Sequence, residues 1–162
     1  MRTPQARNLA STSSCDLRIT KPQEHRIETS NWDHRLPGGK LWDHLTDYIS
    51  APRPINDRVI ELAAQKELSE EAGIDLPESS FKIMHISKCG ATVKWDLYYV
   101  LAIVPSSFEA RNILTSEGEH VISNWFEYAD AIKLCLEGEI SEDRTLGVLL
   151  KFLLNSSLNK VA

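Results

Sequence analysis

The chain has 162 residues, enough for one domain with a sizeable core. Its apolar content of 42% is ordinary for a globular protein, and its net charge of −5 excludes the basic surface typical of nucleic-acid-binding proteins. Three widely spaced cysteines with no CxxC pair exclude a disulfide framework and indicate a reducing compartment, the cytoplasm. The sequence contains no run of about 18 apolar residues, so no membrane span is expected.

The N-terminal residues 1–31 are polar and weakly patterned, so we expect an irregular lead-in, with a short strand only at Leu17–Thr20. This lead-in has no apolar region of the kind found in a secretory signal. We expect one domain at 32–156, which opens with a glycine-containing turn at 32–40, and a tail at 157–162.

The next elements are more strongly patterned. Apolar spacing predicts a helix over Arg58–Ala72, with Asp57 as its N-cap and Gly73 as the glycine that ends it. Further elements are expected in this order: strands at Phe81–Ser87, Lys94–Val104 and Val121–Phe126, then helices at Tyr128–Glu137 and Arg144–Leu154. The mixture predicts a single α+β domain.

Three glutamates, Glu67, Glu70 and Glu71, lie at the end of the first helix. At about 100° per residue they fall within an arc of roughly 100°, on nearly the same side as the apolar residues of the first two turns. We therefore expect all three to face inward, where carboxylates repel one another, lose hydration and oppose the helix dipole. A bound Mg²⁺ or Mn²⁺ would relieve these penalties, because hard cations prefer oxygen ligands. The alternative is an exposed, charged helix surface.

Two segments form a pattern in chain order: Leu36-Pro37-Gly38-Gly39-Lys40 in the glycine turn, and Lys66–Ile74, which reads KELSEEAGI, at the end of the first helix. Together they resemble the signature of the Nudix hydrolase family. A looser resemblance, to the branch that cleaves ADP-ribose and nucleotide sugars, includes Glu117-Gly118-Glu119, Trp125 and Gly138-Glu139-Ile140. The resemblance implies an α/β/α sandwich with a mixed β-sheet, although no convincing opening strand is found within residues 1–31.

The resemblance also implies an activity and roles for individual residues. The activity is metal-dependent hydrolysis of a nucleoside diphosphate linked to another moiety, with a nucleotide sugar as the favoured substrate. Glu67, Glu70 and Glu71 would bind Mg²⁺ or Mn²⁺, and Gly38 and Gly39 would supply backbone to the metal or phosphate site. The catalytic residues would be Glu67, Glu70 and Glu119, with Glu117 as the alternative to Glu119. The expected partner is a small nucleotide, with no nucleic-acid polymer and no membrane; a homodimer is left open.

The chain departs from the family signature in three places. An insertion is expected within 41–56, because 27 positions separate Gly39 from Lys66. Arg58 stands where the signature has its first glutamate, for which Asp57 and Glu61 are the nearby substitutes, and Lys66 replaces an arginine and loses its bidentate geometry. These departures favour the alternative of a catalytically weak or inactive nucleotide-binding module; an unrelated α/β protein with a structural glutamate cluster is the third hypothesis.

Other polar and aromatic residues carry weaker predictions. We interpret four residues near the glycine turn as solvated loop residues rather than as a second metal site: His34, His44, Asp33 and Asp43. Stacking on a base stays open for Trp32 and Trp42, and core packing is expected for Trp95, Tyr98, Tyr99, Phe126 and Phe152.

Overall fold

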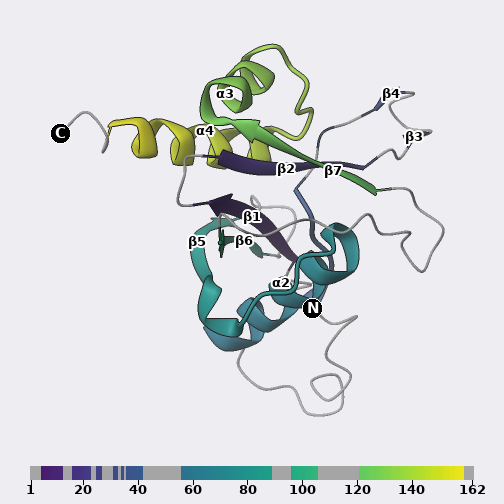
Figure 1. Ribbon diagram of the computed structural model, residues 1–162, viewed down its shortest axis with the longest axis vertical. Coiled ribbons are helices and arrows are strands. Elements are labelled where there is room, and N and C mark those ends of the chain that lie inside the picture. Colours follow the sequence, from purple (N-terminus) through teal and green to yellow (C-terminus); the bar gives the residue numbers. More distant parts are fainter. Residues whose placement is uncertain are drawn as a thin grey trace.

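One mixed β-sheet forms the centre of the molecule (Figure 1). The computed structural model describes residues 5–12, 16–22, 25–26, 31–32, 34, 36–41, 56–88, 96–105 and 121–158. The strands of the sheet are β1 (Gln5–Thr12), β2 (Asp16–Pro22), β5 (Phe81–Lys88), β6 (Asp96–Val104) and β7 (Val121–Glu127), in the order β5-β6-β1-β2-β7. The β1–β6 pair is parallel and the other pairs are antiparallel, so the predicted mixed sheet is confirmed.

The irregular lead-in expected for residues 1–31 is wrong. β1 pairs with β6 over its whole length, from Gln5 opposite Leu97 to Thr12 opposite Val104, and β2 pairs with β7 along seven positions. The opening strand therefore exists and is central. An apolar run does not mark this strand, because its composition is polar and pairing with a distant strand specifies it. A small second sheet pairs β3 (His25–Arg26) with β4 (Asn31–Trp32).

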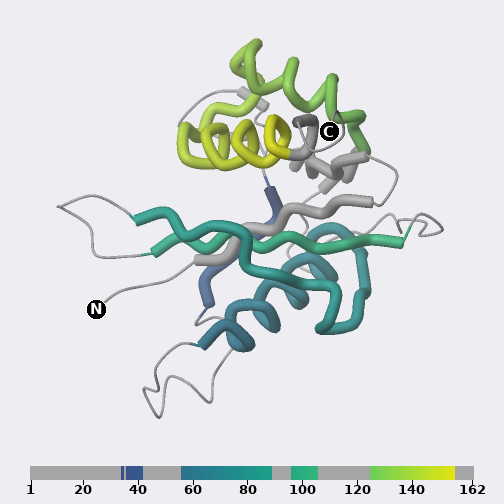
Figure 2. Tube along the Cα trace, turned by 90° about the vertical axis from the view of Figure 1, so that its left-hand side faces the viewer, coloured from purple at the N-terminus to yellow at the C-terminus, as the bar shows by residue number. Residues whose placement is uncertain are grey.

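Helices cover the two faces of the sheet, as Figure 2 shows with the strands between the layers. Helix α2 (Asp57–Ala72) covers one face, and α3 (Tyr128–Leu136) and α4 (Asp143–Leu158) cover the other. The alternation of β6 divides the core accordingly: Val100, Ala102 and Val104 pack with α2, and Leu97 and Tyr99 pack with α3 and α4. The α/β/α sandwich is thus confirmed.

Helix α2 begins and ends close to where the sequence places it. Asn56, in an extended conformation, is the N-cap: its side-chain oxygen accepts a hydrogen bond from the Val59 amide at 3.1 Å. The predicted cap, Asp57, is wrong by one residue, because Asp57 is already helical. Gly73 ends the helix in the left-handed region, with a φ of 63°, as predicted.

The remaining elements match their predictions within a few residues, apart from α4, which continues beyond the expected end at Leu154. A short 3₁₀ turn, η2 (Glu78–Ser80), leads into β5, and a bulge between Ile83 and His85 shifts the register of β5 against β6. Among the described residues, none of the helices is both long enough and apolar enough to cross a membrane.

Candidate functional site

The segment that contains the paired glycines passes from one side of the sheet to the other. Leu36 is buried in the core with α3 and α4, whereas Leu41 is buried in the core with α2. In Figure 2 this segment, drawn in dark blue, lies between the two helical layers. Gly38 and Gly39 lie between these two anchors, so the core on either side fixes both ends of the glycine turn.

Glu71 contacts this turn directly. The backbone amide of Gly38 donates a hydrogen bond to Glu71 Oε2 at 3.0 Å, across 33 positions of sequence. Glu71 is half-buried. A carboxylate bonded to a backbone amide has a fixed orientation, so the end of α2 and the glycine turn form one structural unit.

Glu67 lies against the second glycine. Its side chain is 6% exposed, which makes it one of the few buried charged residues among those described. A methyl group added to Gly39 would lie 1.9 Å from Glu67 Oε1 and 2.6 Å from its carboxyl carbon. The buried carboxylate occupies the room where a Cβ would be, so any larger residue at position 39 would have to displace the Glu67 side chain.

Glu70 does not face inward, and the prediction that all three glutamates do so is wrong for this residue. Its side chain is 53% exposed and lies 3.7 Å from Lys66 Nζ, one turn earlier. The buried stripe of α2 drifts from Val59 and Ala63 towards Leu68 and Ala72 in the last turn, which leaves Glu70 at its edge. Glu70 borders an open hollow of about 300 Å³ that Lys66, Ser69 and Asp75 also line.

Arg58, which replaces the first glutamate of the signature, lies outside this cluster. It is exposed in the first turn of α2, and its Nε lies 2.9 Å from Glu78 Oε1 of η2. Glu67 lies nine positions after Arg58, which corresponds to about 13 Å along the helix. Asp57 and Glu61, the nearby candidates to substitute for that glutamate, also lie in the first half of α2. The contacts between the helix and the glycines are therefore made by Glu67 and Glu71 in its last turns.

The chemistry of the carboxylates suits a hard divalent cation, which prefers oxygen ligands. Glu67 and Glu71 already meet the glycine turn, and Glu70 lies three positions after Glu67, close to it on the helix surface. Within the described part of the chain, however, no three acidic, histidine or cysteine side chains are gathered closely enough to hold a metal ion. A three-carboxylate site therefore requires Glu70 to turn from Lys66 towards Glu67 and Glu71.

Several predicted candidates fall outside the described residues. These are Glu117, Glu119, His44, Asp33, Asp43, Trp42 and Trp95, together with most of the expected insertion. His34 is described, and the solvated-loop interpretation is wrong for it. Its side chain is buried, its ring packs edge-on to Phe126 at 5.9 Å, and its Nε2 lies 4.0 Å from Glu139 Oε2.

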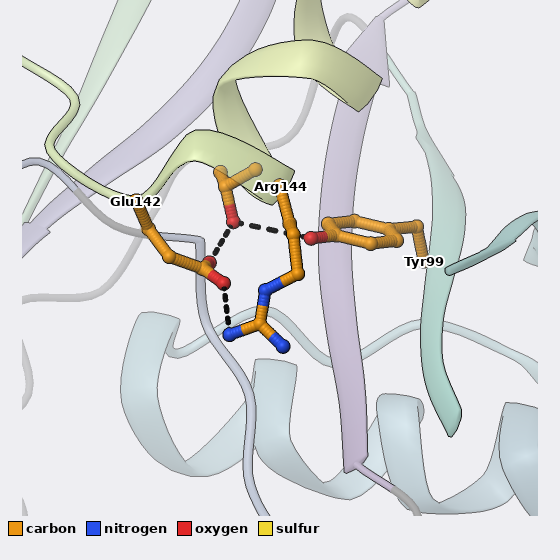
Figure 3. Close-up of polar contacts among 4 residues, drawn as sticks. Tyr99, Glu142 and Arg144 are labelled. Atoms are coloured by element: carbon orange, nitrogen blue, oxygen red, sulfur yellow. Dashed lines mark hydrogen bonds and ion pairs between the residues drawn. The ribbon is translucent and has the colours of Figure 1, made fainter. Parts of the chain in front are cut away.

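Sequence reasoning missed a polar cluster on the opposite face of the sheet, formed by Tyr99, Glu142, Arg144 and Thr145 (Figure 3). Tyr99 was predicted as core, which is confirmed, but its hydroxyl lies 3.4 Å from Thr145 Oγ1. A run of polar residues just before a helix suggests capping, and this was the only sequence signal for the cluster.

Cys135 is buried in α3. Burial raises the pKa of its thiol to about 11, because the interior disfavours the thiolate. At neutral pH this thiol is therefore protonated, and it is unsuited to act as a nucleophile.

Comparison with known proteins supports the fold. No model of a protein family matches the sequence, and no curated protein matches it. A C. elegans Ap4A hydrolase, solved as a binary complex, is 18% identical with a TM-score of 0.58, over 96% of this chain and 98% of that chain. A MutT/nudix family protein from Enterococcus faecalis is 13% identical with a TM-score of 0.51, over 78% of this chain and 44% of that chain.

The chain therefore spans less than half the length of the E. faecalis protein and nearly the full length of the C. elegans enzyme. At these low identities the likeness establishes the fold. The chain adopts the Nudix fold, as its resemblance to the signature implied.

Proposed function

We propose that the protein is a metal-dependent hydrolase that cleaves a phosphoanhydride bond in a nucleoside diphosphate linked to another moiety. One observation carries the proposal: two glutamates of the KELSEEAGI helix end contact the paired glycines, Glu71 through the Gly38 amide and Glu67 against Gly39. The Nudix fold of the chain is consistent with this activity.

The glutamates would hold Mg²⁺ or Mn²⁺, with Glu67, Glu70 and Glu71 as ligands. When bound, such a cation offsets the charge of bridging phosphates and lowers the pKa of a coordinated water. The chain itself would supply the positioning: Glu71 fixes the glycine turn, and the turn offers backbone to a phosphate. Glu67, Glu70 or Glu119 would accept the proton of the attacking water as a general base.

Two substrate classes lead the proposal. The sequence resemblance favours a nucleotide sugar. The C. elegans neighbour, which matches this chain over nearly its whole length, is an Ap4A hydrolase and favours a dinucleoside polyphosphate. In both classes a chain of two or more phosphates links a nucleoside to a second group. The net charge of −5 favours such small ligands over a nucleic-acid polymer, and the cysteine pattern favours a cytoplasmic location.

A binding module without hydrolysis is the second candidate. The observation in its favour is the Arg58–Glu78 ion pair. Arg58 stands where the signature has a glutamate, and its side chain makes an exposed surface contact. Such a module would bind the same nucleotides and leave them intact.

A hydrolysis screen separates the two candidates. The purified protein would be incubated with Mg²⁺ or Mn²⁺ and nucleoside triphosphates, ADP-sugars, dinucleoside polyphosphates or coenzyme A, and the products would be separated by chromatography. Turnover of an ADP-sugar or a dinucleoside polyphosphate supports the hydrolase. Binding of a nucleotide with no turnover of any compound supports the module instead.

The variant Glu70→Gln tests the metal ligands. It should lower metal-dependent turnover at least about 100-fold, because a neutral amide is a poor ligand for a hard cation. The melting temperature should hardly change, since Glu70 is half exposed. Glu137→Gln, which changes an exposed residue paired with Lys133, is the matched control and should keep full activity. Full activity in Glu70→Gln would show that the ligand assignment is wrong.

A further inference from the structure

A relay of polar contacts links strand β6 to the start of α4 (Figure 3). The Tyr99 hydroxyl lies 3.4 Å from Thr145 Oγ1, and the Thr145 hydroxyl donates to Glu142 Oε2. The second carboxylate oxygen of Glu142 lies 2.8 Å from Arg144 Nη2. Because the threonine proton goes to the carboxylate, the tyrosine is the donor in the first contact.

Two of these polar groups are deep in the core. Tyr99 is fully buried and Thr145 is 4% exposed. A buried hydroxyl is costly unless it is hydrogen-bonded, so the two hydroxyls hold each other and the Glu142 carboxylate in one arrangement. Glu142, the residue just before α4, is thereby tied to the middle of the sheet.

Glu142 ends the short connection between α3 and α4, and this connection contacts the segment that leads to the glycines. The His34 amide donates to the Glu139 carbonyl at 3.3 Å, and the His34 ring approaches the Glu139 carboxylate. Ile140 and Leu36 are buried in the same core cluster as Tyr99. The α3–α4 connection therefore holds the glycine segment at His34, and the same segment contacts Glu71 at Gly38.

We propose that Thr145 is a positioning residue for the glycine turn. Through Glu142 it fixes the α3–α4 connection against His34, and through that contact it keeps Gly38 in place for its hydrogen bond to Glu71. Its role in catalysis rests on the proposed function of the glutamates, whereas the mechanical coupling can be measured without any substrate.

Hydrogen exchange of single backbone amides, followed by NMR on the metal-free protein, tests the coupling. In Thr145→Val, which keeps the shape and removes the hydroxyl, the amides of His34 and Gly38 should exchange about fivefold faster, the effect of one lost hydrogen bond. The amides of Gly73 and Ile74, which are bonded within the end of α2, should keep their rates. Thr145→Ser, which restores a hydroxyl, should restore slow exchange.

Two results would overturn the proposal. Equal acceleration at all four amides would mean that Thr145 supports only the overall stability, and unchanged rates at His34 and Gly38 would mean that the relay does not reach the turn. Should Thr145→Val fail to fold, Glu142→Ala, which removes the acceptor of the Thr145 hydroxyl at a partly exposed position, gives the same comparison. A protein that hydrolyses nothing would refute the proposed function and leave the exchange result readable.

Discussion

Gly39 matters for the space that it leaves to the Glu67 carboxylate rather than for its backbone conformation. Positive φ values among the glycines of the described residues occur at Gly73 and Gly138, so Gly39 does not need the left-handed region. Instead, the Glu67 carboxylate occupies the space that a side chain at position 39 would need. A single absent methyl group thus lets a buried charge approach the backbone, and this contact joins α2 to the turn.

Gly39→Ala should therefore displace the Glu67 carboxylate. We expect a loss of roughly 1–3 kcal/mol in the free energy of unfolding, the usual cost of overpacking, and a strong loss of any metal-dependent activity. Urea-induced unfolding measures the first effect. Gly147→Ala is the control: it lies exposed in α4 with no atom near its added methyl group, and it should stabilise the protein by about 0.5–1 kcal/mol. Equal stability of Gly39→Ala and the wild type would contradict the contact.

The part of the site that sequence reasoning predicted is the part that local periodicity encodes. Helical spacing places Glu67 and Glu71 on the inner side of α2, and the signature pairs them with Gly38 and Gly39; the structure brings all four together. The exposure of Glu70 was not predictable in this way. It depends on the drift of the buried stripe in the last turn of α2, which is a property of the packing.

At the scale of the element, α2 was predicted well because its signals are local. A polar cap, an apolar stripe and a terminal glycine lie within a short stretch, and each has a physical role that does not need the rest of the chain. The one-residue error at the cap arose because Asn56 and Asp57 are both good N-cap residues, and only the backbone conformation distinguishes them.

Asn56→Ala tests the observed cap. Loss of the bond from the Val59 amide should lower the free energy of unfolding by about 1 kcal/mol, and Asn56→Asp, which can accept the same bond, should keep most of the stability. Asp57→Ala is the discriminating control, because under the sequence-based assignment it would be the costly change. A larger loss in Asp57→Ala than in Asn56→Ala would show that the cap is Asp57. Thermal unfolding of the three variants decides the matter.

At the scale of the whole molecule, the sequence misled us about the centre of the sheet. The edge strand β5 and its neighbour β6 are apolar and were predicted. In contrast, β1 was not predicted and β2 was predicted only in part, at Leu17–Thr20, because both contain few apolar residues. Their strand structure depends on parallel pairing with β6, about 90 residues away, and on antiparallel pairing with β7. Contacts of such long sequence separation leave no local period to detect.

Removal of residues 1–22 should therefore unfold the protein, although these residues were expected to form an irregular lead-in. The deletion removes two inner strands and leaves β6 and β7 each without one paired neighbour, so the five-stranded sheet is split. The loss of backbone pairing and of the sheet that carries both cores exceeds the roughly 5–15 kcal/mol that stabilises a typical domain.

We expect no cooperative thermal transition and poorly dispersed amide NMR signals. Deletion of residues 1–4, which leaves β1 entire, is the matched control and should retain the transition. A folded, cooperative protein after removal of residues 1–22 would show that β1 and β2 are dispensable to the sheet and that the domain begins where the sequence pattern first suggested.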